Sequence, residues 1–448
     1  MAENKDFEID EHGVLVRYLG REAHVTVPNG VREIGFASFS KRDFLESVTL
    51  PGSVRTVAHS AFGFCPRLSR VTFSEGVERL EYHAFIGCSA LTHVSLPDSV
   101  LHIDGSCFEG CSSLSYTERD GAYYLGSTEN PYAALIASKE NIEACAIAEG
   151  TRLIAEKAFD GRVSLRSLHL PSTLRAVDTM AFYECDKIAE LSLPEGLVHI
   201  GDWAFEAAPI EVLLLPDSLT YLGEDAFASA PLRVLSLPPS LTYIGKRAFL
   251  PHALPKREHE GGLYLGDEAH PYTCLVGVTD KSLCSLSLHA DTKILFAGAL
   301  DGCALLTEVT LPEGVRQIGE RAFRACKALR SIAFPSSLRL VDEEAFADCV
   351  GLSRIAFSGA PLALESAAFS GCEALTELCL HAVEVGDNVF DGCTGLRHVT
   401  VGADVNLYGY DVFTGCEALC SVTLPKDKDV PYAITSLEGE GGIEIKYL

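Results

Sequence analysis

Residues 54–73 read VRTVAHSAFGFCPRLSRVTF, and residues 77–97 read VERLEYHAFIGCSALTHVSLP. Both stretches follow one pattern, V-x-x-I-x-x-x-A-F-x-x-C-x-x-L-x-x-V-x-L-P, and their phenylalanines, Phe62 and Phe85, are 23 residues apart. A fixed period in the twenties is typical of a solenoid, in which each coil buries its apolar side chains against the next coil. The repeat therefore predicts a one-dimensional stack of coils, which can hold 448 residues in one continuous body.

The same position recurs fifteen times, mostly in steps of 22 or 23 residues, with two gaps of 51 residues from Phe108 to Phe159 and from Phe249 to Leu300. Each coil should hold one strand at L-x-x-V-x-L, a second at V-x-x-I, and a 3₁₀ or single helical turn at A-F-x-x-C. We therefore expect a β-rich repeat solenoid of about 15 coils of 22–23 residues with a buried spine of rings. The spine residues are Phe39, Phe62, Phe85, Phe108, Phe159, Phe182, Phe205, Phe227, Phe249, Leu300, Phe323, Phe346, Phe369, Phe390 and Phe413.

The two gaps contain segments of similar sequence, GAYYLGSTENPYAALIAS at residues 121–138 and GGLYLGDEAHPYTCLVGV at residues 261–278. An aromatic strand, a glycine-containing turn, a Pro-Tyr step and a second apolar strand predict a β-hairpin arm in each gap. We place these arms near residues 116–150 and 252–291. Their equal spacing suggests duplication of a segment of 141 residues (108 to 249), and Pro431-Tyr432 repeats the Pro-Tyr step weakly.

Both ends of such a stack need covers, because end coils expose apolar faces and unpaired strand edges. Residues 1–30 contain an alternating segment that predicts an N-terminal β cap. Residues 31–425 form the predicted solenoid with its inserted arms. Residues 426–448, which contain the KDKD stretch and the terminal GGIEIKYL, are the expected C-terminal cap.

The net charge of −26 is the strongest signal in the composition. Nucleic acid and anionic membrane surfaces are disfavoured as partners, because both are bound through lysine and arginine. The charge fits either a basic partner or simple solubility of a long apolar stack. No secretory signal and no apolar run long enough for a transmembrane helix is visible. We expect a cytoplasmic chain as it stands, and a secreted or cell-surface protein if the N-terminus is processed or truncated.

Ten of the sixteen cysteines occupy one slot of the repeat, three residues after the spine residue. Ala208, Ala230 and Val163 lie near that slot in other coils, which indicates a small buried hydrophobe, the usual behaviour of free cysteine. No C-x-x-C pair exists, so metal binding is not expected. The ten are Cys65, Cys88, Cys111, Cys185, Cys303, Cys326, Cys349, Cys372, Cys393 and Cys416.

The A-F-x-x-C core, the L-P-x-S-V step at residues 96–100 and the Y-L-G…N-P-Y arm at residues 124–132 resemble the BspA-type leucine-rich repeat proteins. The resemblance covers nearly the whole chain. It implies a curved right-handed solenoid with short parallel strands on its concave side. It also implies a mostly bacterial family, often at the cell surface, whose members are implicated in adhesion and in binding host proteins. The family offers no catalytic residues to carry over.

Ligand contacts in a solenoid should use the outward positions of each L-x-x-V-x-L strand, which repeat in register. Val212, Leu214 and Val234 are apolar at such positions, and they either form a contact site or lie under the second arm through Leu263, Tyr264 and Leu265. The arm tyrosines either anchor a partner or pack the arm onto the coil beside it. The candidate partner-binding residues are Arg70, His93, His169, Val212, Leu214, Val234, Arg354, His398, Tyr124, Tyr132, Tyr264 and Tyr272.

Catalytic patterns such as G-x-S-x-G, H-E-x-x-H, a Walker loop and G-x-G-x-x-G are absent from the sequence,. We therefore expect no enzyme, no catalytic residue, no cofactor and no metal. The favoured function is a protein–protein interaction scaffold that uses the concave strand face and the arms, with an unknown and possibly basic protein partner. The alternative is a secreted or cell-surface adhesin or carbohydrate-binding module, so a glycan stays open as a ligand. We expect a monomer.

Overall fold

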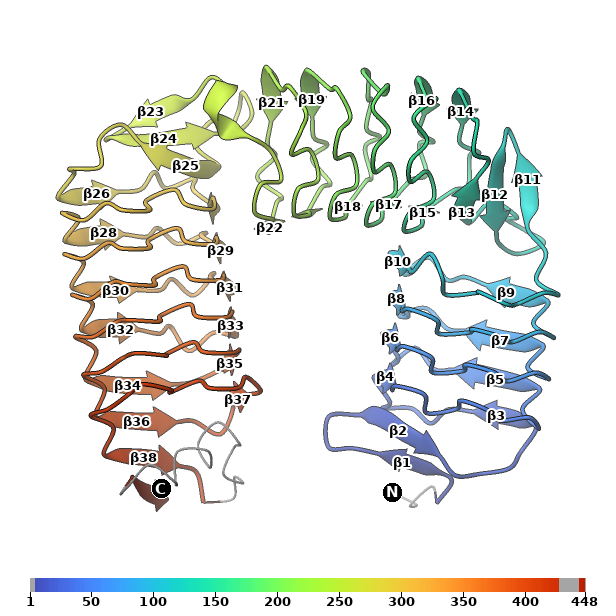
Figure 1. Cartoon of the computed structure of the whole chain (residues 1–448), viewed down its shortest axis with the longest axis horizontal. Coiled ribbons are helices and arrows are strands. Elements are labelled where there is room, and N and C mark those ends of the chain that lie inside the picture. The colour runs from blue at the N-terminus through green and yellow to red at the C-terminus, as the bar shows by residue number, and fades with distance from the viewer. Residues whose placement is uncertain (1–4, 427–442, 448) are drawn as a thin grey trace. The chain divides into compact units, whose positions relative to one another are not determined.

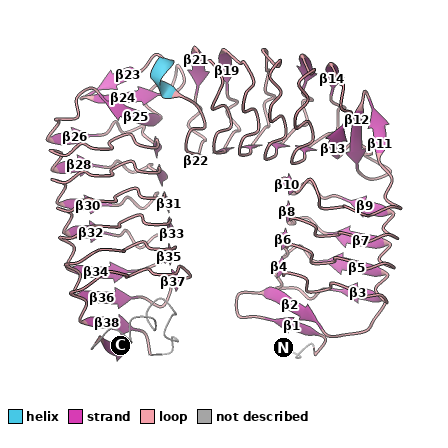
Figure 2. Ribbon diagram, viewed as in Figure 1, coloured by secondary structure: helices cyan, strands magenta, loops and turns pink. Residues whose placement is uncertain are grey.

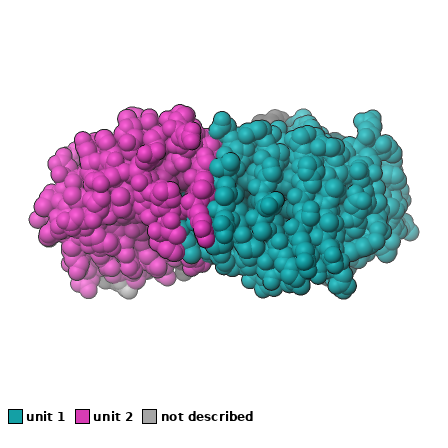
Figure 3. All heavy atoms as spheres, turned by 90° about the horizontal axis from the view of Figure 1, so that it is seen from above, with its two compact units in different colours: residues 1–232, 248–250 teal, residues 233–247, 251–448 magenta. Residues whose placement is uncertain are grey.

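A computed structural model describes residues 5–426 and 443–447 of the chain (Figure 1). These residues form a β-solenoid of about 18 turns, which confirms the predicted fold class. The count exceeds the predicted 15 coils because the caps and arms add turns that lack the phenylalanine motif. Short strands joined by loops and turns dominate the structure, and one 3₁₀ helix, η1 (Pro251–Ala253), is present in the described part (Figure 2). The chain divides into two compact units (Figure 3): unit 1 is residues 1–232 with 248–250, and unit 2 is residues 233–247 with 251–448.

Unit 1 begins with an antiparallel pair, β1 and β2, and β2 then pairs in parallel with the first short strand of the stack. Before the first arm, two sheets run along the coils. The short-strand sheet is β1 (Phe7–Ile9), β2 (Val14–Tyr18), β4 (Glu33–Ile34), β6 (Thr56–Val57), β8 (Arg79–Leu80) and β10 (His102–Ile103). The L-x-x-V-x-L sheet is β3 (His24–Thr26), β5 (Ser47–Leu50), β7 (Arg70–Phe73) and β9 (His93–Ser95).

The first arm has three antiparallel strands, one more than the predicted hairpin, because residues before the glycine turn also pair. Its third strand, β13, pairs in parallel with β15 and so returns the chain to the stack. The strands from the arm onward in one sheet are β11 (Thr117–Arg119), β12 (Ala122–Leu125), β13 (Ala134–Ser138), β15 (Leu153–Ile154), β17 (Ala176–Val177), β18 (His199–Ile200) and β20 (Tyr221–Leu222). The L-x-x-V-x-L strands of these coils are β14 (Ala144–Ala146), β16 (Ser167–His169) and β19 (Val212–Leu214).

Unit 2 repeats this plan, with a second three-stranded arm made of β23, β24 and β25. Its first two strands are β21 (Val234–Ser236) and β22 (Tyr243–Ile244). The sheet that contains the arm is β23 (Arg257–His259), β24 (Gly262–Leu265), β25 (Cys274–Val278), β27 (Ile294–Leu295), β29 (Gln317–Ile318), β31 (Leu340–Val341), β33 (Leu362–Leu364), β35 (Val383–Val385) and β37 (Asn406–Leu407). The L-x-x-V-x-L strands are β26 (Ser285–Ser287), β28 (Glu308–Thr310), β30 (Ser331–Ala333), β32 (Arg354–Ala356), β34 (Glu377–Leu380), β36 (His398–Val401) and β38 (Ser421–Leu424).

At the C-terminal end, β39 (Glu444–Tyr447) pairs in parallel with β38 and extends the sheet by one strand. The Pro431-Tyr432 step and most of the KDKD stretch lie outside the described residues.

The core is the predicted spine of rings. Phe182 stacks on Phe159 and on Phe205 with ring centroids 4.9 and 5.0 Å apart and planes within 13°. In unit 2, Phe346 stacks in the same way between Phe323 and Phe369. The centroid spacing matches the strand spacing of about 4.8 Å, so in-register pairing of the strands brings each ring onto the next.

The A-F-x-x-C stretch forms successive turns rather than the expected 3₁₀ or helical turn. The reason is a left-handed residue inside the stretch, two positions after the spine residue, as at Glu184 (φ 57°) and Ala325 (φ 57°), and a second one lies just before the stretch, as at Met180 (φ 54°). A helix cannot pass through a positive φ, because its residues all need negative values. The left-handed residue instead donates its amide hydrogen to the following coil, as Met180 N does to the Asp202 carbonyl at 2.8 Å.

The ten slot cysteines are free and buried, as predicted. Nine of the thiols also donate a hydrogen bond to a spine carbonyl of the preceding coil, for example Cys88 Sγ to Phe62 O at 3.0 Å and Cys349 Sγ to Phe323 O at 3.1 Å. The slot therefore suits cysteine, because it needs a small apolar group that can also donate a hydrogen bond.

The assignment of Val163 to this slot is wrong, since that side chain is 49% exposed. Arg162 occupies the slot, three residues after Phe159, and its guanidinium donates to Ser138 O of the arm strand β13. Arg42, in the coil that follows the N-terminal hairpin, donates to Tyr18 O in the same way. A longer side chain is needed at these two places because the preceding turn is a hairpin or an arm rather than a regular coil.

Candidate functional site

The predicted charged and imidazole residues of the L-x-x-V-x-L strands point to solvent. Arg70 on β7 and His93 on β9 are exposed and are register partners on neighbouring strands. His169 on β16 and Arg354 on β32 are exposed on other strand pairs. His398 on β36 is exposed too, and its Nδ1 lies 3.0 Å from Ser421 Oγ of the next coil. The outward positions of successive strands thus form rows of solvent-exposed side chains along each sheet.

The predicted apolar residues are also exposed to solvent. In unit 1, Val212 and Leu214 on β19 are 52% and 60% exposed, and in unit 2 Val234 on β21 is 46% exposed. The alternative of a patch covered by the second arm is wrong, because each of these side chains is 46–60% exposed. The structure thus leaves these large apolar side chains in contact with solvent.

The arm tyrosines divide into two classes. Tyr124 and Tyr264 are fully buried, so for these two the anchor alternative is wrong and the alternative that they pack the arm is right. Each packs edge-on against the Pro-Tyr residue of its arm, Tyr132 or Tyr272, with centroids 5.3 and 5.6 Å apart. Burial raises the pKa of Tyr124 to about 12, and its hydroxyl accepts a hydrogen bond from Ala148 N. Tyr132 and Tyr272 are partly exposed at the arm surface.

Sequence reasoning missed a row of exposed rings in the first coils. Phe36, His59 and Tyr82 occupy the same turn position, two residues after β4, β6 and β8, and lie 5.3 and 5.0 Å apart in sequence order. Phe36 is 70% and Tyr82 46% exposed. The available signal was their spacing of 23 residues outside the core slots of the repeat.

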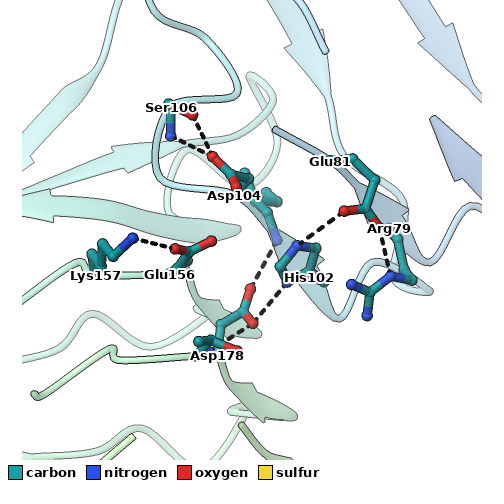
Figure 4. Close-up of polar contacts among 10 residues, drawn as sticks. Arg79, Glu81, His102, Asp104, Ser106, Glu156, Lys157 and Asp178 are labelled. Carbon is teal, nitrogen blue, oxygen red and sulfur yellow. Dashed lines mark hydrogen bonds and ion pairs between the residues drawn. The ribbon is translucent and has the colours of Figure 1, made fainter. Parts of the chain in front are cut away.

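A buried polar cluster lies where unit 1 bends at the first arm (Figure 4). His102 Nδ1 of β10 is 2.8 Å from Asp178 Oδ1, and Asp178 follows β17. Asp178 Oδ2 also accepts the amide hydrogen of Ile103 at 2.9 Å. On the other side of the ring, His102 Nε2 is 3.9 Å from Glu81 Oε2, and Glu81 pairs with Arg79 at 2.8 Å. Asp178 is 1% exposed, so its buried oxygens need these hydrogen-bond donors in place of water,.

The protonation of two histidines in this region is shifted in opposite directions. Burial lowers the pKa of His102, but the hydrogen bond and the charge of Asp178 outweigh burial and raise that pKa above its usual value. Burial lowers the pKa of His199 to about 4, and its ring stacks on Tyr221 with centroids 4.5 Å apart. The cluster therefore favours a charged His102 beside a neutral His199.

The inside of this bend is lined by the short V-x-x-I strands. Besides the Asp178 contacts, Arg152 Nη1 in the coil after the arm is 2.6 Å from Asp98 Oδ1 in the coil before it. Figure 1 shows β4, β6, β8 and β10 on this inner side. The expectation that the L-x-x-V-x-L strands with Arg70 and His93 form the concave face is therefore wrong for unit 1. The coils before and after the first arm contact one another on the side of the short V-x-x-I strands.

The hydrogen bonds of the polar cluster join side chains within a coil and between coils. Among the described residues, no nucleophilic hydroxyl or thiol forms a hydrogen bond with His102, and Ser106 donates its hydroxyl hydrogen to Asp104 instead (Figure 4). In residues 5–426 and 443–447 no three His, Cys, Asp or Glu side chains converge as metal ligands. Within the same residues, no helix has the length and apolarity that a membrane crossing requires.

Comparisons with known proteins agree with the fold. The family model of the BspA type leucine rich repeat region matches six copies, over residues 21–123, 136–254 and 293–420. No curated protein matches the chain.

Among solved structures, a leucine-rich repeat protein from Bacteroides ovatus is 20% identical, covers 98% of this chain and 97% of its own, and has a TM-score of 0.33. A leucine-rich repeat protein from T. pallidum is 22% identical over 43% of this chain and 100% of its own, with a TM-score of 0.35. The pneumococcal vaccine antigen PcpA is 17% identical over 97% of this chain and 92% of its own, with a TM-score of 0.28.

Proposed function

The chain belongs to the BspA-type leucine-rich repeat family, and on that premise we propose that it is a non-catalytic scaffold for protein–protein interaction. The observation that carries the proposal is the exposure of Val212 and Leu214, at 52% and 60%, on outward positions of β19. Elsewhere in this slot of the repeat the residues are mostly small or polar, as at Thr72 and Thr310. Two adjacent outward apolar side chains gain free energy when a partner removes them from water.

The contact surface extends along the L-x-x-V-x-L strands rather than along the inside of the bend. Arg70 and His93 on β7 and β9 of unit 1 are exposed polar residues on such strands, and in unit 2 Arg354 on β32 is exposed at the same kind of position. Interfaces of stable complexes combine an apolar centre with a polar rim that includes arginine. The net charge of −26 favours a partner with a basic contact surface,.

The test is capture of partners from the source organism on the immobilised full chain, compared with capture on Leu214→Asp. A charge at this position should weaken retention of a specific partner at least tenfold, because a central contact is worth about 2 kcal/mol or more. Thr310→Asp on β28 is the matched control, since Thr310 is exposed in the same slot of another coil. Arg354→Glu tests the strands of the same kind in unit 2. Retention unchanged by Leu214→Asp and by Arg354→Glu would reject this strand surface as the interface.

The exposed row Phe36, His59 and Tyr82 supports a second candidate, a carbohydrate-binding adhesin module, since sugar rings stack on exposed aromatic faces,. A glycan array probed with the full chain and with Tyr82→Ala separates the two. Binding that free sugar competes away and that Tyr82→Ala abolishes would favour the carbohydrate function. The absence of such binding would favour the protein scaffold.

A further inference from the structure

The spine of stacked rings is interrupted at the first arm. Phe108 stacks on Phe85 with centroids 5.5 Å apart, and the next spine residue, Phe159, stacks on Phe182. Within the described residues no ring contact joins Phe108 to Phe159 across the 51-residue gap. Phe108 is accordingly 7% exposed, whereas Phe62 and Phe85 are 0% exposed. The break leaves one face of the Phe108 ring without the ring that the repeat would place there.

A cavity of about 530 Å³ opens at this break, between the fourth coil of the spine and the first arm. Its lining includes Phe108, Tyr116, Tyr123, Ile136 and Glu109. We call it the arm pocket. The volume falls in the range of about 300–1,000 Å³ that binding pockets occupy, and a large aromatic side chain fits within it.

The position of the pocket follows from the repeat. Gly105, which also lines it, holds the turn position that Phe36, His59 and Tyr82 hold in the three preceding coils. A Cβ at Gly105 would lie 3.0 Å from Glu156 O, so this coil has no room for the ring that the three preceding coils carry. The row of exposed rings therefore ends at the coil that borders the arm.

The chemistry of the lining selects an aromatic group next to positive charge. Three aromatic side chains and Ile136 provide apolar walls, which favour burial of another ring over burial of sugar hydroxyls. Glu109 is the ionisable carboxylate of the lining; its side chain is 64% exposed, and His83 lies 3.0 Å away. Tyr116 is 39% exposed at the mouth, and burial raises its pKa to about 12, so its hydroxyl stays neutral. Cations also bind over aromatic faces.

The arm supplies a second contact for an extended segment. Tyr116 is followed directly by β11 (Thr117–Arg119), the first strand of its sheet, which pairs with β12 on one side. An edge strand offers main-chain donors and acceptors to an added strand, and pockets beside it select side chains of that strand.

We propose that the arm pocket binds an aromatic side chain of an extended, basic segment of a partner protein. The inference rests on the proposed interaction function and names the chemistry of the segment that is bound. It uses a surface separate from Val212 and Leu214, so the two can be tested apart.

The second arm provides an internal control with the same backbone pattern. At the corresponding positions, 140 residues later, Lys256 replaces Tyr116, Leu263 replaces Tyr123 and Val276 replaces Ile136. The register is also the same: Tyr123 pairs with Ala137 and Leu263 with Gly277, each beside a bulge. Lys256 Nζ lies 3.3 Å from the carbonyl oxygens of His252 and Leu254. Replacing the aromatic residues removes the walls that the proposal requires.

The experiment measures binding of three capped tripeptides, Lys-Trp-Lys, Lys-Ala-Lys and Glu-Trp-Glu, to the full chain by isothermal titration calorimetry. We expect Lys-Trp-Lys to have a Kd at least about tenfold lower than either other peptide. Ile136→Trp, which fills the pocket, should remove that preference, and Val276→Trp in the second arm should leave it unchanged. Glu109→Gln should raise the Kd several-fold, and the effect should fade at high salt.

Tyr116→Ala is a second pocket variant, for the case in which Ile136→Trp disturbs the folding of the arm. Tyr116 is 39% exposed, so its truncation should disturb the arm less. Loss of the preference in Tyr116→Ala supports the proposal by itself. Equal affinity for Lys-Trp-Lys and Lys-Ala-Lys, or a preference that survives both Ile136→Trp and Tyr116→Ala, overturns it. If the pocket variants have no effect while Leu214→Asp still abolishes partner capture, this inference fails and the proposed scaffold function stands.

Discussion

The carboxylate of Asp178 accepts a hydrogen bond from the backbone amide of Ile103 at 2.9 Å, although 75 residues separate them in the chain. Ile103 ends β10, the last strand of its sheet, so its amide would otherwise have no ladder partner there,. In unit 2 the side chain of Gln317 bonds both main-chain groups of Ile244 on β22, at 2.8 and 3.1 Å. A polar side chain thus completes a short strand near each arm.

Removing the Asp178 carboxylate should destabilise unit 1 strongly. Asp178→Ala leaves the Ile103 amide and the His102 ring without their buried acceptor, and breaking a buried pair in this way costs about 3–5 kcal/mol. Urea unfolding followed by far-ultraviolet circular dichroism measures the change. Asp217→Ala, in an exposed turn, is the control and should change the free energy of unfolding by less than about 0.5 kcal/mol,. Equal losses in the two variants would contradict a structural role for the pair.

The same pair should make stability depend on pH. The pKa of His102 is higher in the folded chain than its ordinary value, so the charged ring stabilises the fold below that ordinary value, near pH 6.5,. The contribution is lost as the pH rises through the folded-state pKa. We therefore expect His102→Gln to cost more stability at about pH 5.5 than at about pH 8.5. Comparing the two proteins at each pH cancels the effect of His199, whose lowered pKa acts in the opposite direction. A cost that is larger at the higher pH would refute the charge assignment.

The fold could be predicted from the sequence because every coil repeats the same core positions. Phe182 and Cys185 are buried where the pattern places them. In-register pairing of the strands then determines how each coil stacks on the next. The errors fall where the repeat is broken. Val163 was placed in the cysteine slot because it is apolar, yet the slot holds Arg162, whose length is needed only beside an arm.

The candidate site was harder to predict, because it depends on contacts between distant coils. Which strand face lies inside the bend follows from pairs such as Arg152 with Asp98, which no local pattern reveals. The arm pocket lies beside Phe108, which lacks a stacking ring on one side; the 51-residue gap marks this break in the sequence, but it does not reveal the cavity beside the arm. Outward strand residues such as Arg70 were found correctly as exposed, since alternation fixes their direction,.

Truncation in the middle of the ring spine should cause local rather than global unfolding. Phe182→Ala removes a fully buried ring between Phe159 and Phe205 and should cost about 3–5 kcal/mol through lost burial and a cavity,. Because coils couple to their neighbours, hydrogen exchange should quicken first in the coils next to Phe182. Phe64→Ala is the control, since Phe64 is 53% exposed. A loss below about 1 kcal/mol in Phe182→Ala would mean that the spine does not carry the stability of the stack.

Thiol reactivity should separate the cysteine slot from the surface. Of the sixteen cysteines, Cys284, Cys379 and Cys420 are exposed and the rest are buried. Burial also raises the pKa of two slot thiols, Cys185 and Cys349, to about 12, and the thiolate is the form that reacts,. A disulfide reagent such as Ellman's should therefore modify three thiols rapidly in the native chain and all sixteen after unfolding in urea.

Matched serine variants identify which thiols make up the rapid class. Cys379→Ser should lower it from three to two, and Cys349→Ser should leave it at three while weakening the stack, because the hydroxyl replaces a well-packed sulfur that donates to Phe323 O. If Cys349→Ser lowered the rapid class instead, the slot would be open to reagent in the native state. That result would contradict the hydrogen bonds from the slot thiols to the carbonyl oxygens of the preceding coil.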